Sequence, residues 1–383
     1  MSSTISSCII CSEMMYNFLY LANQGMDIIR IDAVPYIWKE LGTNCRNLQQ
    51  VHTIVRMMRM ICEIVCPGIV LLGEVVMEPE KVAPYFGTVE KPECHMLYNV
   101  TTMATTWNTV ATRDVRLLRK QMDIVCSLPK EYTFLNYLRC HDDIGWGLDY
   151  ATLSEWGMKE VPHKKYLNDY FQGRTEGSVS RGELYNEDPV TGDARFCATT
   201  ASMCGIESAG FEQDEEKMER AVVKDIMLHA YMFTQSGIPM LYSGDEIGQV
   251  NDYTYKDDPD KAPDSRYIHR GKFCWDLAEN IEKKGSVQEK IFHALTRLEE
   301  IRRNDAVFSA DAEVYTKDYS DISILWIVRK AEGRELHAVF NFSDEEKEIW
   351  MPEVTEYTDL LTGEREVIEK TRLQSWGFLW LER

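Results

Sequence analysis

The chain has 383 residues, of which 44% are hydrophobic and 27% are charged, a composition typical of globular proteins. Its net charge is −20, from 42 basic and 62 acidic residues, and it contains no long basic run. Nucleic acids and anionic membranes attract cationic surfaces, so this charge argues against both classes of partner.

The N-terminal segment predicts neither a signal peptide nor a membrane span. No basic start precedes its apolar residues, and Ser, Glu and Asn interrupt them. Eleven cysteines are spread from Cys8 to Cys274 without a dense framework. Cys8 and Cys11 form a lone C-x-x-C, which is weak evidence for a zinc or redox site. We therefore expect reduced thiols and a cytoplasmic protein.

Five short apolar runs predict the parallel strands of an α/β protein, because near-continuous apolar runs of this length are typical of strands covered on both faces. The runs are 27–34, 68–75, 95–100, 133–140 and 238–245. Between them, segment 47–65 carries an apolar stripe at helical period and ends before Pro67. A later helix begins at Ser286, which has the spacing of a capping box to Glu289. We expect βαβ units as far as residue 304.

Two further regions differ from this alternation. Segment 144–205 is a long connection rich in Gly, Asp, Asn and Tyr, and such connections are usually functional or disordered. Its aromatic residues favour an ordered loop subdomain inserted into the domain 1–304. In region 305–383, strand-like runs alternate with charged turns, which predicts a C-terminal antiparallel β domain, a sandwich in preference to a barrel. These runs are 323–330, 336–343, 357–361 and 374–383.

Polar residues gather at the carboxyl ends of the predicted parallel strands. In parallel sheets and barrels, active sites lie at that edge. The residues concerned are Asp32, Glu74, His141, Asp142, Asp143, Asp245 and Glu246. The last two also have a simpler interpretation as charges at the start of a helix. The convergence of carboxylates from different strands predicts an active site built on them.

Arg30 and Asp32 lie two residues apart, so both side chains point to one face of their strand. A neighbouring arginine keeps an aspartate ionised, as a covalent nucleophile requires. Glu74 follows the apolar run GIVLLG, a setting that would raise its pKa and keep it protonated for a general acid. Such a pair of carboxyl groups is the arrangement of a retaining glycosidase. The alternative is a buried ion pair without a catalytic role.

The stretches GMDIIRIDAV, GIVLLGEV and YLRCHDDIGW resemble three signature regions of glycoside hydrolase family 13, the α-amylase family. Together with NEDPVTGDARF and DDPDKAPDSRYIHR, they are more closely similar to amylosucrases, which split sucrose and pass the glucosyl group to an α-glucan. The resemblance runs from about residue 12 to the C-terminus. It implies a partial TIM (β/α)8 barrel, with strands four to eight of the family's eight, and then a C-terminal β-sandwich.

The resemblance implies that Asp32 is the nucleophile, Glu74 the acid and base, and Asp142 the third carboxylate. The substrate-binding residues that it implies are Arg30, His141, Asp143, Arg195 and Arg266. Asp143 and Arg195 match an ion pair that closes the base of the sucrose pocket in amylosucrases. The substrates implied are sucrose and an α-glucan, and neither a metal nor a cofactor is implied.

The matched motifs belong to strands four to eight, so activity is expected to depend on a complementing N-terminal half-barrel. One alternative is a sucrose hydrolase or another α-glucosidase of the same family, which shares the three carboxylates. The alternative from a different class is a non-catalytic remnant, or a half-barrel that associates with a partner chain.

Overall fold

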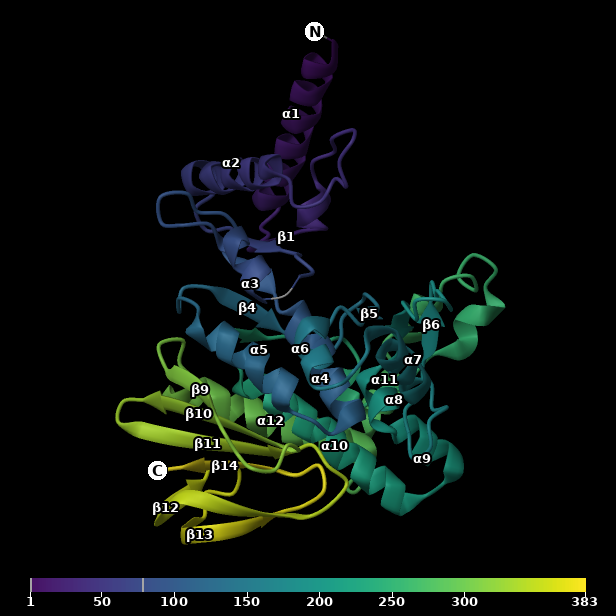
Figure 1. Cartoon of the computed structure of the whole chain (residues 1–383), viewed down its shortest axis with the longest axis vertical. Coiled ribbons are helices and arrows are strands. Elements are labelled where there is room, and N and C mark those ends of the chain that lie inside the picture. The colour runs from purple at the N-terminus through teal and green to yellow at the C-terminus, as the bar shows by residue number, and fades with distance from the viewer. Residues whose placement is uncertain (1, 78) are drawn as a thin grey trace. The chain divides into compact units, whose positions relative to one another are not determined.

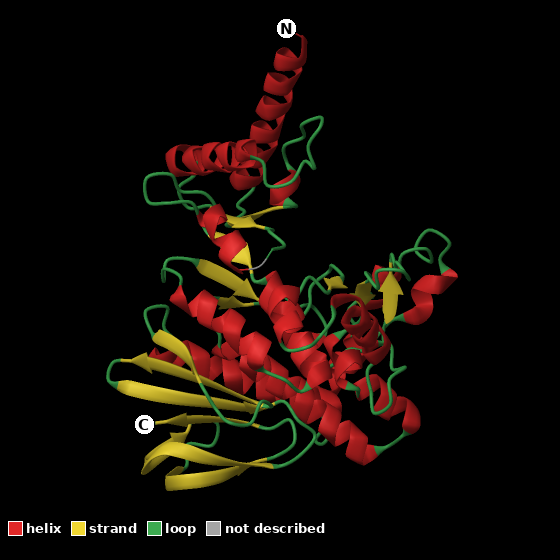
Figure 2. Cartoon of the chain, viewed as in Figure 1, coloured by secondary structure: helices red, strands yellow, loops and turns green. Residues whose placement is uncertain are grey.

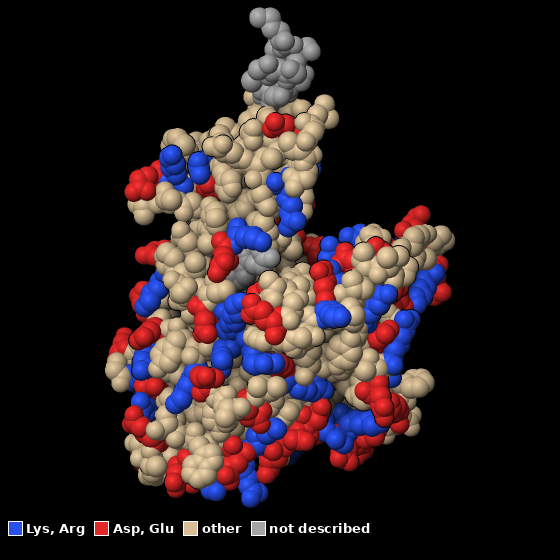
Figure 3. Space-filling model, viewed as in Figure 1, with Lys and Arg blue, Asp and Glu red and all other residues tan. Residues whose placement is uncertain are grey.

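The computed structural model describes residues 2–77 and 79–383, and the side chains of residues 10–77 and 80–383. On the face shown in Figure 3, acidic and basic side chains are interspersed without a large continuous basic area. No helix in the described part of the chain is both long and apolar enough to cross a membrane.

The chain divides into two compact units, and its elements are labelled in Figure 1. The N-terminal unit consists of Met1–Val100 and Leu128–Leu135, and the C-terminal unit consists of Thr101–Ser127 and Asn136–Arg383.

Parallel strands in the order β1-β2-β3-β4 form the centre of the N-terminal unit. They are β1 (Ile28–Ile31), β2 (Val70–Gly73), β3 (Met96–Tyr98) and β4 (Thr133–Asn136). Each lies within a run that the sequence predicted, which confirms the parallel sheet. Every strand is shorter than its run, because the polar residues at its carboxyl end belong to a loop. Ile31 pairs with Gly73, so the carboxyl ends of β1 and β2 are adjacent.

The helical elements of the N-terminal unit are α1 (Ser2–Asn23), η1 (Val34–Tyr36), α2 (Gln49–Val65), α3 (Pro79–Val82) and η2 (Ala83–Phe86). The helix predicted over 47–65 is confirmed as α2. A buried cluster joins Phe18 of α1 and Cys62 of α2 to Ile29 and Leu71 of the two neighbouring strands. Burial of such apolar side chains is the main free-energy gain of the unit.

Four long helices organise the C-terminal unit: α4 (Val100–Thr112), α5 (Arg116–Ser127), α10 (Glu215–Thr234) and α12 (Val287–Asn304). The predicted cap of α12 is confirmed, because Ser286 Oγ accepts a hydrogen bond from the Glu289 N–H at 3.0 Å. The Glu289 carboxylate, however, accepts from the Gly285 N–H rather than from Ser286. The shorter elements are α9 (Ile206–Glu212), η3 (Asp245–Ile247), η4 (Tyr253–Asp257), η5 (Ser265–His269), α11 (Trp275–Ala278), η6 (Glu279–Glu282) and η7 (Ala306–Phe308).

The fifth predicted strand is reduced to β8 (Ile238–Pro239), which lies in the C-terminal unit. The Met240 N–H donates to the Asn136 carbonyl at 2.8 Å, and Asn136 Nδ2 donates to the Ser236 carbonyl at 2.7 Å. Both ends of this short strand are therefore fixed to the last residue of β4.

The inserted segment 144–205 is ordered, as its aromatic content predicted. It contains more regular structure than expected: β5 (Ile144–Gly145), α6 (Tyr150–Glu155), α7 (Glu160–Phe171), β6 (Glu183–Tyr185), β7 (Arg195–Cys197) and α8 (Thr200–Cys204). The three strands form a small sheet in the order β5-β7-β6. Phe171 packs against both Trp146 and Phe196, with a ring-centroid distance of 5.3 Å to each, and these two rings lie 6.4 Å apart. This aromatic core holds together elements that are individually too short to persist.

The C-terminal strands form one hydrogen-bonded antiparallel sheet (Figure 2). Its order is β13-β12-β14-β11-β10-β9. The strands are β9 (Glu313–Lys317), β10 (Ile324–Ala331), β11 (Arg334–Asn341), β12 (Lys347–Asp359), β13 (Arg365–Leu373) and β14 (Phe378–Glu382).

The buried cluster of this sheet brings Trp326 of β10 together with Ile349 of β12, two strands that are not neighbours in the strand order, and the sandwich stays a prediction. The register of β12 shifts between Trp350 and Thr355, and this strand begins well before the expected run 357–361. The expected boundary between residues 304 and 305 falls at the end of α12. That it separates two domains stays a prediction.

His337 lies in the core of this sheet with 1% of its surface exposed, and its Nδ1 accepts a hydrogen bond from Trp326 Nε1 at 3.2 Å. Burial lowers the pKa of His337 from 6.5 to about 4, and the charge of Glu335 opposes this only in part. The folded protein therefore binds this proton less readily than the unfolded chain does. The contribution of His337 to the free energy of unfolding is therefore fully present above pH 6.5. It falls by about 1 kcal/mol per pH unit as the pH is lowered toward 4.

Urea unfolding between pH 7 and pH 4 tests this expectation. His337→Gln should flatten the pH profile, because glutamine does not titrate. His293→Gln, on the exposed side of α12, is the matched control and should keep the wild-type slope. Identical slopes in the wild type and His337→Gln would contradict the assignment.

Candidate active site

One guanidinium group connects the two carboxylates that the sequence singled out in the N-terminal unit. Arg30 Nη1 donates to Asp32 Oδ1 at 2.7 Å, and Arg30 Nη2 lies 3.1 Å from Glu74 Oε2. Burial lowers the pKa of Arg30, but the hydrogen bond to Asp32 and the charge of Glu74 outweigh it and raise that pKa above its usual value. The structure thus brings Arg30, Asp32 and Glu74 together at the carboxyl ends of β1 and β2, as predicted.

The turn that follows β1 is built around Glu74. Ala33 adopts the left-handed conformation, with φ +45°, and its N–H donates to Glu74 Oε2 at 2.8 Å. The next N–H, of Val34, donates to the Glu74 carbonyl at 3.1 Å. Gly73 is required before Glu74, because a Cβ there would lie 2.7 Å from Cys94 Sγ and 2.9 Å from a methyl group of Leu97. Sequence analysis missed the role of the Ala33 N–H.

The surroundings of Glu74 differ from the apolar setting that the sequence predicted. Its carboxylate receives the Ala33 N–H and lies against Arg30, and both contacts favour an ionised carboxylate. The run GIVLLG describes the body of β2, whereas the Glu74 side chain reaches back to the β1 turn, and the expected protonation of Glu74 stays a prediction. Asp32, by contrast, has 76% of its side chain exposed and is open to a reacting group.

Ala33→Val should destabilise the N-terminal unit and displace Glu74. A β-branched residue at positive φ is strained, at a cost of about 1–3 kcal/mol. Ala33→Gly keeps the N–H and removes the strain, so it is the matched control and should be at least as stable as the wild type. Urea unfolding measures both variants. Equal stability of the valine and glycine variants would contradict the observed backbone conformation.

A second cluster lies in the C-terminal unit, after β4. His141 Nε2 lies 3.2 Å from Asp142 Oδ2, and Arg270 Nη2 lies 3.6 Å from Asp142 Oδ1. Arg270 Nε also donates to the His141 carbonyl at 2.6 Å, so this arginine holds both the backbone and the carboxylate. Arg270 was missed, although it ends the quoted motif DDPDKAPDSRYIHR.

The predicted ion pair between Asp143 and Arg195 is not found among the described side chains, where no N–O distance between the two is within 4.0 Å. Arg195 pairs with Gly145 across β5 and β7, and its guanidinium occupies the space over that glycine, where a Cβ would lie 1.8 Å from Nη1. Burial raises the pKa of Asp143, and the charges of Arg195 and Arg266 oppose this only in part. The two predicted partners are therefore close enough to interact, without direct contact.

Arg266 is held by its neighbour Asp264. Its Nη2 lies 2.7 Å from Asp264 Oδ2, and its guanidinium lies 4.8 Å from the ring centroid of Tyr185. The hydrogen bond with Asp264 raises the pKa of Arg266, so the group remains a cation. Any contact with substrate would come from a guanidinium fixed in this way.

Asp245 belongs to a buried ion pair that the sequence did not reveal. Arg139 Nε donates to Asp245 Oδ1 at 2.7 Å, and the two side chains are only 2% and 3% exposed. Asp245 does begin η3, as its interpretation as a helix-start charge predicted, and Glu246 accepts from the Gly244 N–H. The pair fixes the backbone two residues before His141.

The site residues are thus divided between the units. Arg30, Asp32 and Glu74 form one cluster, and a larger set lies in the C-terminal unit: His141, Asp142, Asp143, Arg195 and Arg266. That Asp142 joins Asp32 and Glu74 in one active site stays a prediction. Ligand atoms of Cys140, His141 and Asp142 lie within 4.8 Å of one another, the one grouping of described residues with metal-ligand spacing.

Curated relatives of the chain are sugar-active enzymes by name. The glucosylglycerate phosphorylase of Escherichia coli is 26% identical over 369 residues, which cover 95% of this chain and 61% of that enzyme. That of Spirochaeta thermophila is 25% identical over 77% of this chain and 47% of its own length. The trehalose synthase of Thermus thermophilus is 26% identical over 60% of this chain and 20% of its own length. The chain therefore spans less than two thirds of these relatives.

Solved structures show the same fold. Sucrose 6F-phosphate phosphorylase from Thermoanaerobacter thermosaccharolyticum superimposes with a TM-score of 0.63 at 18% identity, over 86% of this chain and 58% of that one. The α-amylase from H. orenii gives a TM-score of 0.59 at 16% identity, over 98% and 64%. No family model matches the chain. The expected closer likeness to amylosucrases is not supported, because the relatives named above are phosphorylases and trehalose synthases. The sugar-active relatives and the shared fold support the resemblance of its motifs to glycoside hydrolase family 13.

Proposed function

We propose that the chain carries the nucleophile and the acid–base residue of a retaining α-glucosyl transfer. The observation that supports this most is the single Arg30 guanidinium, which contacts both Asp32 and Glu74. Two carboxyl groups with different surroundings, one exposed and one held by a backbone N–H, are what two distinct catalytic roles require.

In the first step, an Asp32 oxygen attacks the anomeric carbon of the donor and forms a glucosyl ester. The bond to the leaving oxygen breaks, and Glu74 gives that oxygen a proton. The ester carries no charge, so the Arg30 guanidinium then acts on Glu74 without competition from the Asp32 charge, which favours the carboxylate form of Glu74. In the second step, Glu74 removes a proton from the acceptor, and the acceptor oxygen displaces Asp32.

The contacts of free Glu74 favour its ionised form, so the first step needs a proton to be gained when the donor binds. Displacement of water by the donor lowers the local dielectric and weakens the charged form. In this proposal, Asp142 binds sugar hydroxyl groups beside His141. The rest of the substrate contacts Arg195, Arg266 and Asp143.

The proposed acceptor is inorganic phosphate, because two of the sequence relatives are named as phosphorylases. Transfer to a sugar is the second candidate, suggested by the relatives named as trehalose synthases. Sucrose as donor, with an α-glucan or water as acceptor, rests on the motif resemblance alone and is assayed beside them.

We also propose that the parallel sheet is the strand four to eight part of a (β/α)8 barrel. Further strands, from a longer chain or from a second chain, would then close the wall beyond β1. Ile28 on this strand is 49% exposed, which supports a further neighbour at that edge. The ten cysteines described are free, which supports a cytoplasmic location.

The test is to incubate the protein with glucosylglycerate, sucrose or trehalose, each with and without inorganic phosphate. Formation of glucose 1-phosphate supports phosphorolysis, and release of glucose supports a hydrolase. Asp32→Asn should release neither product. Equal product release by the wild type and Asp32→Asn would overturn the proposal. Absence of turnover even with the barrel completed by a supplied half would identify a non-catalytic remnant.

A further inference from the structure

A cavity of about 250 Å³ lies in the C-terminal unit, and none of the residues assigned to sugar chemistry lines it. Its lining residues come from α8, α9 and α10, from the residue that follows α4, and from the loops that precede β6, β12 and β14. These elements are labelled in Figure 1. The lining residues that matter are Arg113, Lys217, Arg220, Lys224, Asp344 and Trp376. Four of these six side chains are cations, so the cavity is a basic one.

Lys224 is the unusual member of this set, because only 3% of its surface is exposed. Its Nζ lies 4.4 Å from the ring centroid of Trp376, yet it has no hydrogen bond or ion pair with any described residue. An ammonium group has three N–H donors, and a buried cation without acceptors is costly. Because Lys224 lines the cavity, an anion bound there would accept hydrogen bonds from its ammonium group.

The only acidic residue lining the cavity already has partners. Asp344 Oδ2 accepts from Arg113 Nε and Nη2 at 3.0 and 2.9 Å, and Asp344 Oδ1 accepts from Trp376 Nε1 at 2.7 Å. Burial raises the pKa of Asp344, but Arg113 and these hydrogen bonds lower it overall. The Asp344 carboxylate is thus paired directly with Arg113, and the charge of Lys224 reaches it only at longer range, without an ion pair.

The other two cations lie at the rim. Lys217 pairs with Glu212, and Arg220 Nη2 lies 2.8 Å from Glu216 Oε1, with both cationic side chains about half exposed. Exposed ion pairs of this kind are weak, so these side chains can turn toward a ligand at small cost.

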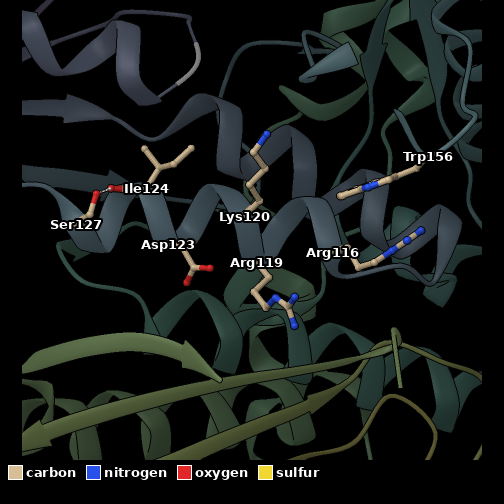
Figure 4. Close-up of a pocket in the computed structure, with 7 residues that line it drawn as sticks. All are labelled: Arg116, Arg119, Lys120, Asp123, Ile124, Ser127 and Trp156. Atoms are coloured by element: carbon tan, nitrogen blue, oxygen red, sulfur yellow. Dashed lines mark hydrogen bonds between the residues drawn. The ribbon is translucent and has the colours of Figure 1, made fainter. Parts of the chain in front are cut away.

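A larger pocket on α5 shows what a structural basic cluster looks like (Figure 4). There Arg116, Arg119 and Lys120 pair with acidic residues, which are Asp114, Asp318 and Asp149 respectively. Each cation of that pocket has a carboxylate partner, and none of them is buried as Lys224 is. Lys224 differs from these three cations because it is buried and has no ion pair with a carboxylate.

We propose that the cavity beside Lys224 binds a small tetrahedral oxyanion, either free inorganic phosphate or the phosphate group of a small sugar phosphate. Its volume is below the range of about 300–1,000 Å³ that holds drug-sized ligands, which favours a small ion. The bound ion accepts hydrogen bonds from Lys224, with Arg220 at the mouth. It joins α10 to the loops that carry Asp344 and Trp376, so it stabilises the C-terminal sheet against the helices. This site is separate from any acceptor phosphate of the proposed reaction.

Thermal unfolding of the full chain tests the proposal, with inorganic phosphate, glucose 1-phosphate and chloride compared at equal ionic strength. Phosphate should raise the Tm of the wild type more than chloride does. Lys224→Gln should weaken the apparent affinity about tenfold or more, since a charge-assisted hydrogen bond is lost. Lys120→Gln makes the same chemical change in the pocket of paired cations, and it should keep the full wild-type response.

Two more variants make the result decisive. Arg195→Gln alters the candidate active site, and it should keep the phosphate response if the ion binds beside Lys224. Arg220→Gln changes an exposed rim residue without risk to folding, and it should weaken the response severalfold. A larger response to glucose 1-phosphate than to phosphate identifies the sugar phosphate as the ligand. No phosphate-specific response in the wild type, or equal responses in the wild type, Lys224→Gln and Arg220→Gln, would overturn the proposal.

Discussion

Asp32→Asn is expected to abolish glucosyl transfer, with a loss of about four orders of magnitude or more in kcat/KM. The amide cannot attack the anomeric carbon, and it also removes the charge that pairs with Arg30 Nη1. Asp27→Asn, before the same strand, makes the same chemical change at an exposed residue and should keep wild-type activity. Steady-state rates with whichever glucoside the wild type uses measure both variants.

Glu74→Gln distinguishes the proposed acid–base role of Glu74 from the proposed nucleophile role of Asp32. With an ordinary glucoside, loss of the acid should lower kcat by about 10²–10⁴. With α-D-glucosyl fluoride, the leaving fluoride needs no proton, so the first step should persist in Glu74→Gln and be lost in Asp32→Asn. The reverse pattern, with fluoride release surviving only in Asp32→Asn, would exchange the roles of the two residues.

Asp245→Ala should lower the free energy of unfolding by about 3–5 kcal/mol, the second largest effect that we expect. It leaves the Arg139 guanidinium buried without its counterion, and breaking a buried pair on one side is far more costly than losing an exposed one. Glu246→Ala removes the neighbouring carboxylate, which only accepts from the Gly244 N–H, so it should cost about 1 kcal/mol.

Urea unfolding of the two variants at neutral pH makes the comparison. Replacement of both partners, Arg139→Met with Asp245→Leu, should recover much of the loss, because no buried charge then remains. Equal losses for Asp245→Ala and Glu246→Ala would show that the buried pair contributes no more than a surface cap.

The parallel strands could be predicted because each buries a continuous apolar run, and such runs are visible in one sequence. The position of Arg30 beside Asp32 follows from the two-residue period of a strand. The setting of Glu74 could not be predicted in this way, since it depends on an alanine at positive φ. Alanine carries no sequence signal for that conformation, which the turn around Glu74 imposes.

Long-range partners set the other limits. Arg139 and Asp245 are far apart in the chain, and each alone reads as an ordinary polar residue near a strand end. Arg195 could be assigned a partner only by resemblance, and in the structure its guanidinium lies over Gly145 instead of contacting Asp143. The predicted closer likeness to amylosucrases is not supported for a related reason. Motifs around the proposed catalytic carboxylates are typical of the reaction that related enzymes share, and they do not identify the donor or the acceptor.

The central claim is that Asp32 forms a covalent glucosyl ester, and mass spectrometry of Glu74→Gln tests it most directly. The variant is treated with α-D-glucosyl fluoride, denatured in acid and digested. Because its second step lacks a base, the intermediate should accumulate, and the peptide that contains Asp32 should gain the mass of one glucosyl group. Fluoride release without this adduct, or an adduct on a peptide without Asp32, would contradict the account.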